Sequence, residues 1–232
     1  MAVDITASSQ KGATVQGAIL WDLDGVLADT GEAHLAAWRA LFAERGESIT
    51  PEQFAETFGM ANLPILRLRY GAGPSDQELA TMGLRKEELY RQFVEGNVVA
   101  LLGVLALLAA AQERGYRQAV ASSGEMANIL TVIRALGIAN YFDALVSGAF
   151  LPRSKPDPAI FVQAAGALGV PPARCLVIED GTVGVEAARR AGMACLAVTT
   201  THPREHLQGA DLIVDSLCEI SPQMLAALVE RG

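Results

Sequence analysis

Two carboxylates lie one residue apart at the end of a short apolar segment near the start of the chain. Residues 18–21 are apolar, and Asp22, Leu23, Asp24 and Gly25 follow them. Side chains two residues apart point to the same side of an extended strand, and open α/β sheets bind their ligands beyond the carboxyl ends of the strands. The sequence therefore predicts that the Asp22 and Asp24 carboxylates share one pocket.

Three other groups of polar residues also follow apolar runs, and a parallel sheet would bring them to the same edge as Asp22. They are Ser122 with Ser123, Lys155, and Glu179 with Asp180. Carboxylates gathered in one crevice repel each other, and their burial is costly unless a cation compensates their charge. An all-oxygen donor set with room for water and a phosphate oxygen favours Mg²⁺ over Ca²⁺. We therefore expect Mg²⁺ as the cofactor.

A second positive charge and several hydrogen-bond donors complete this set. Lys155 precedes Pro156, Asp157 and Pro158, which restrict the backbone before a predicted helix, with Asp157 as its N-cap. The two serines lie at a strand-to-helix junction, where a phosphate is readily held, and Gly25 lets the backbone approach a ligand closely. A carboxylate nucleophile, a second carboxyl, a metal, an ammonium and hydroxyl donors are what phosphoryl transfer through an aspartyl-phosphate requires.

Each of these motifs also has a plain structural alternative. An Asp-x-Asp before Gly is often only a turn, and Ser122 with Ser123 can cap a helix as readily as it can contact phosphate. Glu179 and Asp180 can cap the helix expected near residue 183, a role that is compatible with metal binding. The presence of all four motifs in one chain makes the chemical interpretation the stronger one.

Composition and charge limit the kinds of partner. The chain has 232 residues, 51% of them hydrophobic, and a net charge of -8. This length and hydrophobicity suit one large globular domain or a core with a smaller insert. The negative charge argues against a surface for nucleic acid or anionic membrane. We expect a small-molecule partner instead.

The start of the chain and its cysteines bear on location. Residues 1–16 are polar and lack the apolar core of an export signal, so we expect a disordered tail there. The three cysteines, Cys175, Cys195 and Cys218, show no close metal-ligand spacing and fit reduced thiols. These features predict a cytoplasmic protein. The longest apolar run, residues 98–111, falls short of the roughly 18–20 residues of a spanning helix and predicts a buried one.

Short apolar runs alternate with helical segments, which is the pattern of a parallel sheet covered by helices. Strands are expected at 18–21, 118–121, 144–146, 175–178, 195–198 and 212–214, and helices at 101–114, 126–136, 158–168, 183–191 and 222–230. Gly115, Gly137, Gly169 and Gly192 lie where left-handed C-caps would end four of these helices. The sequence therefore predicts an α/β fold with a three-layer, Rossmann-like core.

The alternation stops between residues 31 and 97, where only helical signals occur. Residues 50–53 and 75–78 both fit capping boxes, and Trp38 and Phe42 extend an apolar face. We expect an inserted all-helical domain at 31–97, with residues 17–30 and 98–232 forming the core.

The four motifs, taken in order, resemble the signature motifs of the haloacid dehalogenase superfamily. They are Asp22-Leu23-Asp24-Gly25-Val26, Ser122, Lys155-Pro156 and Glu179-Asp180. The resemblance covers nearly everything after Gly17. It implies a Rossmann-like core with a helical cap of the C1 type inserted after the first motif, as in phosphoglycolate phosphatases and β-phosphoglucomutases.

The same resemblance implies roles for the motif residues. Asp22 would be the nucleophile, and Asp24 would protonate the leaving oxygen and then activate water. Asp22, the backbone carbonyl of Asp24 and Asp180 would hold Mg²⁺, with Glu179 binding the ion or standing behind its ligands. The phosphoryl group would be bound by Ser122 and Lys155, with Ser123 and Gly25 beside them. The dehalogenases of the superfamily lack an acid at Asp24, so its presence favours attack on phosphorus.

Cap residues separate a phosphatase from a phosphomutase. His34 lies where the mutases carry a histidine near the active site, but Asn62 replaces the arginine expected to bind a second phosphate. Glu125 and Met126 likewise replace a basic residue and an amide. Arg67, or Arg69, is a candidate to compensate from the next turn. We therefore predict a Mg²⁺-dependent phosphatase for a small phosphorylated metabolite, with a β-phosphoglucomutase-like enzyme as the alternative.

A non-enzymatic receiver module is a more remote alternative. Receiver domains also hold an aspartyl-phosphate with an acidic pair, a hydroxyl residue, a lysine and Mg²⁺. Such a module needs no helical insert and no acid at the position of Asp24. The sequence leaves the substrate and the oligomeric state open, and it marks Met60, His34, Asn62 and Arg67 as residues that would shape the substrate pocket.

Overall fold

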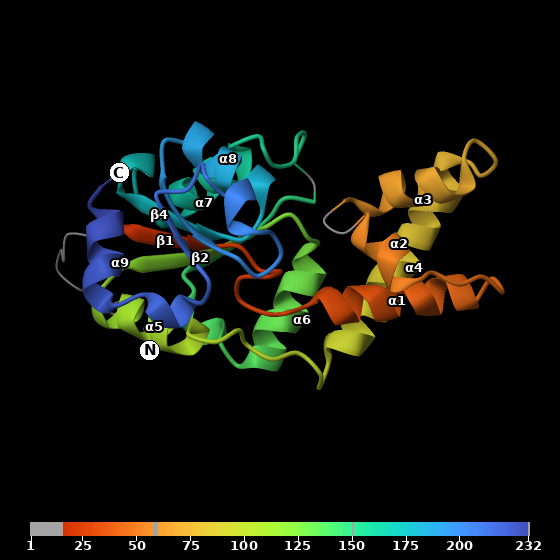
Figure 1. Ribbon diagram of the computed structural model, residues 1–232, viewed down its shortest axis with the longest axis horizontal. Coiled ribbons are helices and arrows are strands. Elements are labelled where there is room, and N and C mark those ends of the chain that lie inside the picture. Colours follow the sequence, from red (N-terminus) through yellow and green to blue (C-terminus); the bar gives the residue numbers. More distant parts are fainter. Residues whose placement is uncertain (1–15, 58–59, 150, 232) are drawn as a thin grey trace, which may run out of the picture.

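The core of the protein is a six-stranded parallel sheet (Figure 1). The computed structural model describes residues 16–57, 60–149 and 151–231, so the expected tail lies outside the described residues except for Gln16. The strands are β1 (Ala18–Trp21), β2 (Arg117–Ser122), β3 (Ala144–Ser147), β4 (Cys175–Glu179), β5 (Ala194–Val198) and β6 (Leu212–Val214). Their order is β3-β2-β1-β4-β5-β6. Every strand lies within one residue of its predicted bounds.

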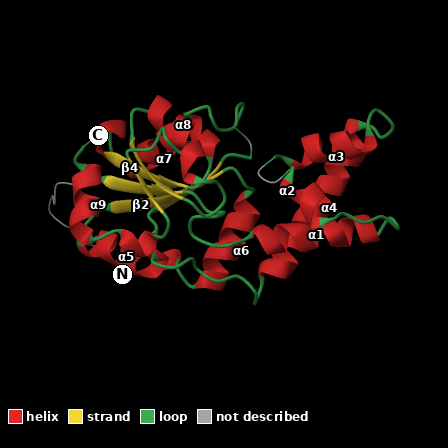
Figure 2. Ribbon diagram, viewed as in Figure 1, coloured by secondary structure: helices red, strands yellow, loops and turns green. Residues whose placement is uncertain are grey.

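Helices cover both faces of this sheet and complete three layers (Figure 2). One face carries α5 (Val104–Glu113), α6 (Met126–Leu136) and α9 (Pro222–Val229), and the other carries α7 (Ala159–Leu168) and α8 (Thr182–Arg190). Short 3-10 helices lie at Ala139–Tyr141, Pro172–Arg174, Arg204–His206 and Leu217–Glu219. The predicted Rossmann-like core is confirmed.

Strand β1 lies in the middle of the sheet and alternates its side chains between the two helical layers. Ile19 and Trp21 pack into the cluster under α5, α6 and α9, whereas Ala18 and Leu20 pack under α7 and α8. All four residues are fully buried, which explains why β1 is uniformly apolar. The Asp22 amide continues the β1–β4 ladder by donating to the Ile178 carbonyl at 3.0 Å. The first predicted acid therefore starts from a rigid position.

Four further helices lie between β1 and α5, beyond the sheet end at which β1 leads into α1 (Figure 1). They are α1 (Gly31–Ala43), α2 (Pro51–Ala55), α3 (Asn62–Tyr70) and α4 (Asp76–Val94), and we refer to them as the cap helices. Both expected capping boxes form, at Thr50 with Gln53 and at Ser75 with Glu78. Trp38 and Phe42 are buried in the α1–α4 core, as expected.

The apolar run at residues 98–111 is not one buried helix, and this corrects the sequence prediction. Gly103 has φ +90° and begins α5, so the helix starts at Val104 rather than at Leu101. A Cβ at Gly103 would lie 2.5 Å from the backbone of Leu217 and Cys218, so this position requires glycine. Residues Val99 and Leu102 are exposed in the segment that precedes the helix. No helix in the described ranges is long and apolar enough to cross a membrane.

Candidate active site

Lys155 joins the ends of three adjacent strands. Its ammonium donates to Asp22 Oδ1 after β1, to Glu179 Oε1 at 2.6 Å at the end of β4, and to the Ala121 carbonyl at 3.4 Å in β2. Burial opposes the charged form of this lysine, but Asp22 and Glu179 outweigh burial and hold the pKa of Lys155 above its ordinary value. The structure therefore brings together the first, third and fourth predicted motifs.

Three buried carboxylates, those of Asp22, Glu179 and Asp180, offer oxygen atoms that all lie within 4.8 Å of one another. Burial raises the pKa of Asp22 to about 7, and Glu179 adds to the shift while Lys155 opposes it. Burial, Glu179 and Asp22 also raise the pKa of Asp180 well above its ordinary value. One lysine does not balance this negative charge, so a hard divalent cation fits the donor set.

The two adjacent acids of the fourth motif have different surroundings. Glu179 uses Oε1 for Lys155, and its Oε2 accepts from the amides of Asp180 and Gly181, both at 3.0 Å. The Asp180 carboxylate accepts from the Thr201 hydroxyl at 2.5 Å, and Thr201 is its sole hydrogen-bond partner among the described side chains. Asp180 is thus the acid with more capacity left for a cation, while Glu179 fixes the lysine. Glu179 thus binds the amide of Gly181, the N-cap residue of α8, and neither acid accepts a hydrogen bond from an amide within Thr182–Arg190.

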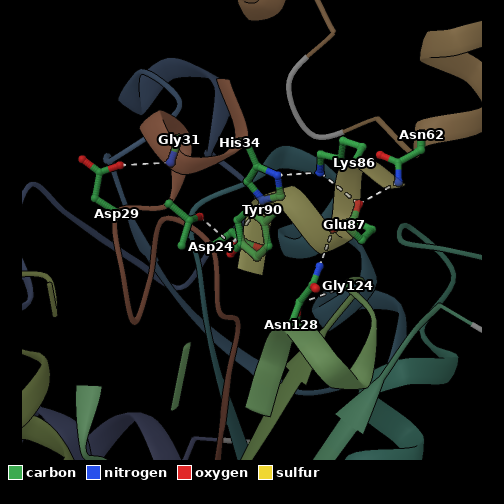
Figure 3. A network of polar contacts seen from close by, with 12 residues as sticks. Asp24, Asp29, Gly31, His34, Asn62, Lys86, Glu87, Tyr90, Gly124 and Asn128 are labelled. Carbon is green, nitrogen blue, oxygen red and sulfur yellow. Dashed lines mark hydrogen bonds and ion pairs between the residues drawn. The ribbon is translucent and has the colours of Figure 1, made fainter. Parts of the chain in front are cut away.

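Asp24 has partners from the cap side rather than from the sheet (Figure 3). Its Oδ1 accepts from the Thr30 hydroxyl at 2.5 Å and from the Tyr90 hydroxyl at 3.4 Å, and His34 Nε2 lies 3.7 Å away. Burial opposes its ionisation, but His34 and Thr30 outweigh burial and keep the pKa of Asp24 below its ordinary value. Asp22 and Asp24 are neighbours at one edge of the sheet, yet their carboxylates are held by different sets of residues.

The serine motif lies at the end of β2, next to the Lys155 contact with Ala121. Ser122 is buried and its Oγ accepts from the Gly124 amide at 3.1 Å, whereas Ser123 is exposed. Helix α6 has Glu125 as its N-cap without a side-chain bond, so the alternative that the serines cap this helix is wrong. Ser122 and Ser123 therefore lie at the end of β2 without capping α6.

The amide of Gly25 has a partner within the protein, and the placement of this residue beside a phosphate stays a prediction. Its N–H donates to the Ala28 carbonyl at 2.8 Å inside the turn that follows β1. Gly25 has φ +78°, and a Cβ there would lie 2.0 Å from Asp180 Oδ2. The glycine is required because the backbone passes close to the Asp180 carboxylate.

Of the three candidate cap residues, His34 and Asn62 belong to the polar network that leads to Asp24, and Arg67 does not. His34 stacks on Tyr90, and its Nδ1 lies 2.8 Å from Lys86 Nζ, so it belongs to the site. Asn62 donates to Glu87 Oε1 at 2.6 Å in the same network (Figure 3).

Arg67 is not brought to the site, and the expectation that it compensates for Asn62 is wrong. Its guanidinium donates to the carbonyls of Gly71 and Pro74 and pairs with Asp76, so it fixes the turn between α3 and α4. Arg69 is similarly committed, to Glu47 at 2.9 Å. Both guanidinium groups therefore have partners within the cap helices and their connecting segments.

The sequence analysis missed several residues of this network. They are Thr30, Lys86, Glu87, Tyr90, Asn128 and Thr201. One local signal was present, because Lys86 and Glu87 place two charges on the otherwise apolar face of α4 that buries Leu79, Leu89 and Val94. The other residues carry no signal in their own segments, since tertiary packing alone brings them to the site.

Several known proteins resemble this chain in sequence and in fold. A family model described as haloacid dehalogenase-like hydrolase matches residues 17–192. A β-phosphoglucomutase from Bacillus subtilis is 32% identical and covers 90% of this chain and 93% of its own. Hexitol phosphatase A from Escherichia coli is 31% identical, and the match covers 87% of this chain and 92% of that protein. The crystal structure of a mutant CbbY from Rhodobacter sphaeroides, in complex with xylulose-(1,5)bisphosphate, matches this fold with a TM-score of 0.81 at 29% identity. The match covers 89% of this chain and 97% of the CbbY chain.

Proposed function

This chain belongs to the haloacid dehalogenase-like hydrolase family, as an enzyme for phosphoric monoesters, and we propose that it is a Mg²⁺-dependent phosphatase working through an aspartyl-phosphate. Its substrate would be a small phosphorylated sugar or polyol. The observation that carries this proposal is the buried Asp22 carboxylate, bonded to Lys155 and clustered with Asp180, with Asp24 two residues further on. The family membership also removes the receiver-module alternative, because that module is not an enzyme.

The donor set fits Mg²⁺ because it is made of oxygen atoms and carries excess negative charge. Asp22 and Asp180 would hold the ion together with the backbone carbonyl of Asp24, and Glu179 would act on it indirectly by fixing Lys155. When bound, the ion supplies positive charge that lets an anionic phosphate approach an anionic carboxylate.

Asp22 is the nucleophile in this proposal. One of its oxygens attacks phosphorus, and the bond from phosphorus to the ester oxygen of the substrate breaks. The ammonium of Lys155 and the hydroxyl of Ser122 would bind the oxygens of the transferring group, because both lie at the strand ends next to Asp22. Placing fixed donors where charge develops is a large part of catalysis in phosphoryl transfer.

Asp24 is the group that moves protons. The negative charge of a bound substrate phosphate would raise the pKa of Asp24 from its depressed value. The protonated carboxyl group then gives its proton to the leaving ester oxygen, and the carboxylate later takes one from the water that attacks the phosphorus of the aspartyl-phosphate. That second attack breaks the bond between Asp22 and phosphorus and releases inorganic phosphate. Thr30, Tyr90 and His34 hold the carboxylate of Asp24 in place for both transfers. Acid–base help of this kind typically contributes about 10²–10⁴-fold.

A phosphomutase must bind a second phosphate group, and the cap residues do not favour one. Asn62 is bonded to Glu87, Arg67 to Asp76, and Glu125 follows the serine motif. These contacts leave carboxylates and amides where a mutase needs cations. The similarity to a β-phosphoglucomutase nevertheless keeps this activity as the second candidate.

The decisive assay measures phosphate release from p-nitrophenyl phosphate, hexitol phosphates and hexose phosphates, with Mg²⁺ and with EDTA. We expect sustained release that requires Mg²⁺. The same reactions with β-glucose 1-phosphate are coupled to detection of glucose 6-phosphate. Formation of glucose 6-phosphate without release of phosphate would replace the phosphatase proposal by the mutase. Release that continues unchanged in EDTA would refute the role of the metal.

A further inference from the structure

Glu87 is the centre of a buried polar cluster that joins the cap helices to the core (Figure 3). Its Oε1 accepts from Lys86 Nζ at 2.9 Å and from Asn62 Nδ2 at 2.6 Å, and its Oε2 accepts from Asn128 Nδ2 at 2.6 Å. Only 6% of Glu87 is exposed. Asn128 belongs to α6, four residues beyond Gly124 in the serine loop, and Lys86 leads through His34 to Asp24. The cluster is therefore linked to Asp24 through Lys86 and His34, and to the helix that follows the serine loop through Asn128.

The ionised carboxylate fixes the orientation of both amides. A carboxylate only accepts hydrogen bonds, so Asn62 and Asn128 must each turn their NH₂ group toward Glu87 and their carbonyl oxygen away from it. The Asn128 oxygen accepts from Arg91 Nη1 at 2.9 Å. Within the described parts of the chain, the Asn62 oxygen has no donor. The half-buried Asn62 therefore presents an acceptor, not a donor, on the side away from Glu87.

The two cations of this cluster are already balanced. Lys86 pairs with Glu87 at 2.9 Å, and Arg91 lies 3.7 Å from Glu125 and also donates to Asn128. Lys86 and its surroundings keep the pKa of Glu87 below its ordinary value although burial opposes ionisation, so Glu87 stays charged at neutral pH. A second substrate phosphate would carry about 1.5 to 2 negative charges. In this cluster it would meet Glu87 and Glu125, and the two cations that the described residues supply there already have acidic partners.

We propose that Glu87 is a specificity-determining residue that selects a phosphate monoester whose far end bears uncharged hydroxyl groups and that rejects a second phosphate. The proposal rests on the proposed phosphatase function and names its substrate class. Hydroxyl groups can donate to the Asn62 carbonyl oxygen and to the remaining lone pairs of Glu87, whereas a phosphate cannot. The binding of like charges at such a boundary is strongly disfavoured. This chain would then differ in substrate charge from the CbbY that was crystallised with a bisphosphate.

The test compares sorbitol 6-phosphate with fructose 1,6-bisphosphate, by phosphate release in the presence of Mg²⁺. We expect the wild-type kcat/KM for the monophosphate to exceed that for the bisphosphate by at least about tenfold, which corresponds to about 1.4 kcal/mol. Glu87→Gln should reduce this ratio by about tenfold. The matched control is Glu88→Gln on the same helix, since Glu88 is exposed and pairs with Arg85 at 2.9 Å. The control should keep the wild-type ratio.

Asn62→Arg provides a second variant that leaves the carboxylate in place. The arginine would extend from α3 and place a guanidinium next to Glu87 of α4. It should raise kcat/KM for the bisphosphate relative to the monophosphate. A wild-type enzyme that prefers the bisphosphate, or a ratio that neither Glu87→Gln nor Asn62→Arg changes, would overturn the inference while leaving the phosphatase proposal intact. Absence of Mg²⁺-dependent release from every ester, p-nitrophenyl phosphate included, would instead overturn the proposed function and this inference with it.

Discussion

Gly184 lies against the carboxylate of Glu179, and a Cβ built on Gly184 would be 1.8 Å from Glu179 Oε1. Oε1 is the oxygen that accepts from Lys155 at 2.6 Å. A glycine inside a helix costs about 0.5–1 kcal/mol relative to alanine. Helix α8 therefore gives up stability at this residue so that the carboxylate holding Lys155 has room.

The substitution Gly184→Ala tests this relationship. The methyl group must push Glu179 away, and Lys155 then loses one of its two carboxylate partners. Since misplacing a catalytic group by about 1 Å can cost roughly 100-fold, we expect kcat/KM for p-nitrophenyl phosphate to fall by about that factor. The matched control is Gly166→Ala in α7, where a Cβ would meet nothing within 4 Å. The control should keep full activity and raise stability by about 0.5–1 kcal/mol. Equal activity in both variants would show that Glu179 does not position Lys155.

Asp22→Asn tests the nucleophile. The amide keeps the shape of the carboxylate and can still accept from Lys155, so we expect a folded protein with a modestly lower melting temperature. Turnover should fall by roughly 10³-fold or more, as expected when a nucleophile is removed. Asp29→Asn is the control, because Asp29 is exposed on the same loop and accepts only a weak bond from the Gly31 amide at 3.3 Å. Retained turnover in Asp22→Asn would refute the assignment.

Asp180→Asn tests the metal site. We expect the Mg²⁺ concentration for half-maximal activity to rise by at least about tenfold, because even residues behind the ligands of a metal site typically contribute 10–100-fold. Asp215→Asn removes an acid that is exposed and paired with Arg204 at 2.7 Å, and it should leave the titration unchanged. If both variants titrate like the wild type, Asp180 is not a ligand.

The sheet and its motifs could be predicted because their signals are local. Buried strands such as β1 and β4 are short apolar runs, and glycines with positive φ end the helices at Gly137 and Gly169. Parallel topology then fixes that residues after successive strands meet at one edge. For this reason Asp22, Lys155 and Glu179 could be expected together from the sequence although they are far apart in the chain.

The cap network could not be predicted, because it depends on how α4 packs on α6. Glu87 meets Asn128 across 41 residues of sequence, and nothing in either segment specifies that contact. Arg67 shows the opposite case, because its position in the sequence suggested a contact with substrate. In the structure its guanidinium binds the carbonyl of Gly71 in the adjacent turn and the carboxylate of Asp76. Gly103 is a third case. Its backbone lies against Leu217 and Cys218 and has a positive φ, so the helix begins only at Val104 although the apolar run begins at residue 98.

Arg67→Gln tests the corrected role of that arginine. Because its partners belong to the turn between α3 and α4 and Asp76 is 82% exposed, the ion pair should contribute at most about 1 kcal/mol to stability. We expect a slightly lower melting temperature and a KM within about twofold of wild type for every substrate, as for a surface substitution remote from the site. A large rise in KM for phosphorylated substrates alone would return Arg67 to the substrate pocket.

The buried pair of Lys86 and Glu87 predicts a specific dependence of stability on acid. Lys86 and the two amides hold the pKa of Glu87 below its ordinary value, although burial opposes this. A carboxyl group whose folded pKa lies below its unfolded value, which is about 4.3 for Glu, stabilises the fold fully above that unfolded value, and this stability is lost as the pH falls through the folded pKa.

The melting temperature of the wild type should therefore exceed that of Glu87→Gln most clearly at pH 6 to 7, where breaking a buried pair costs about 3–5 kcal/mol. The difference should shrink below about pH 4, because the wild-type carboxyl then becomes protonated and resembles the amide. Glu88→Gln, measured by the same thermal melts, should stay close to the wild type at every pH. A difference between the wild type and Glu87→Gln that is constant from pH 7 to pH 3 would mean that Glu87 is not ionised in the folded protein.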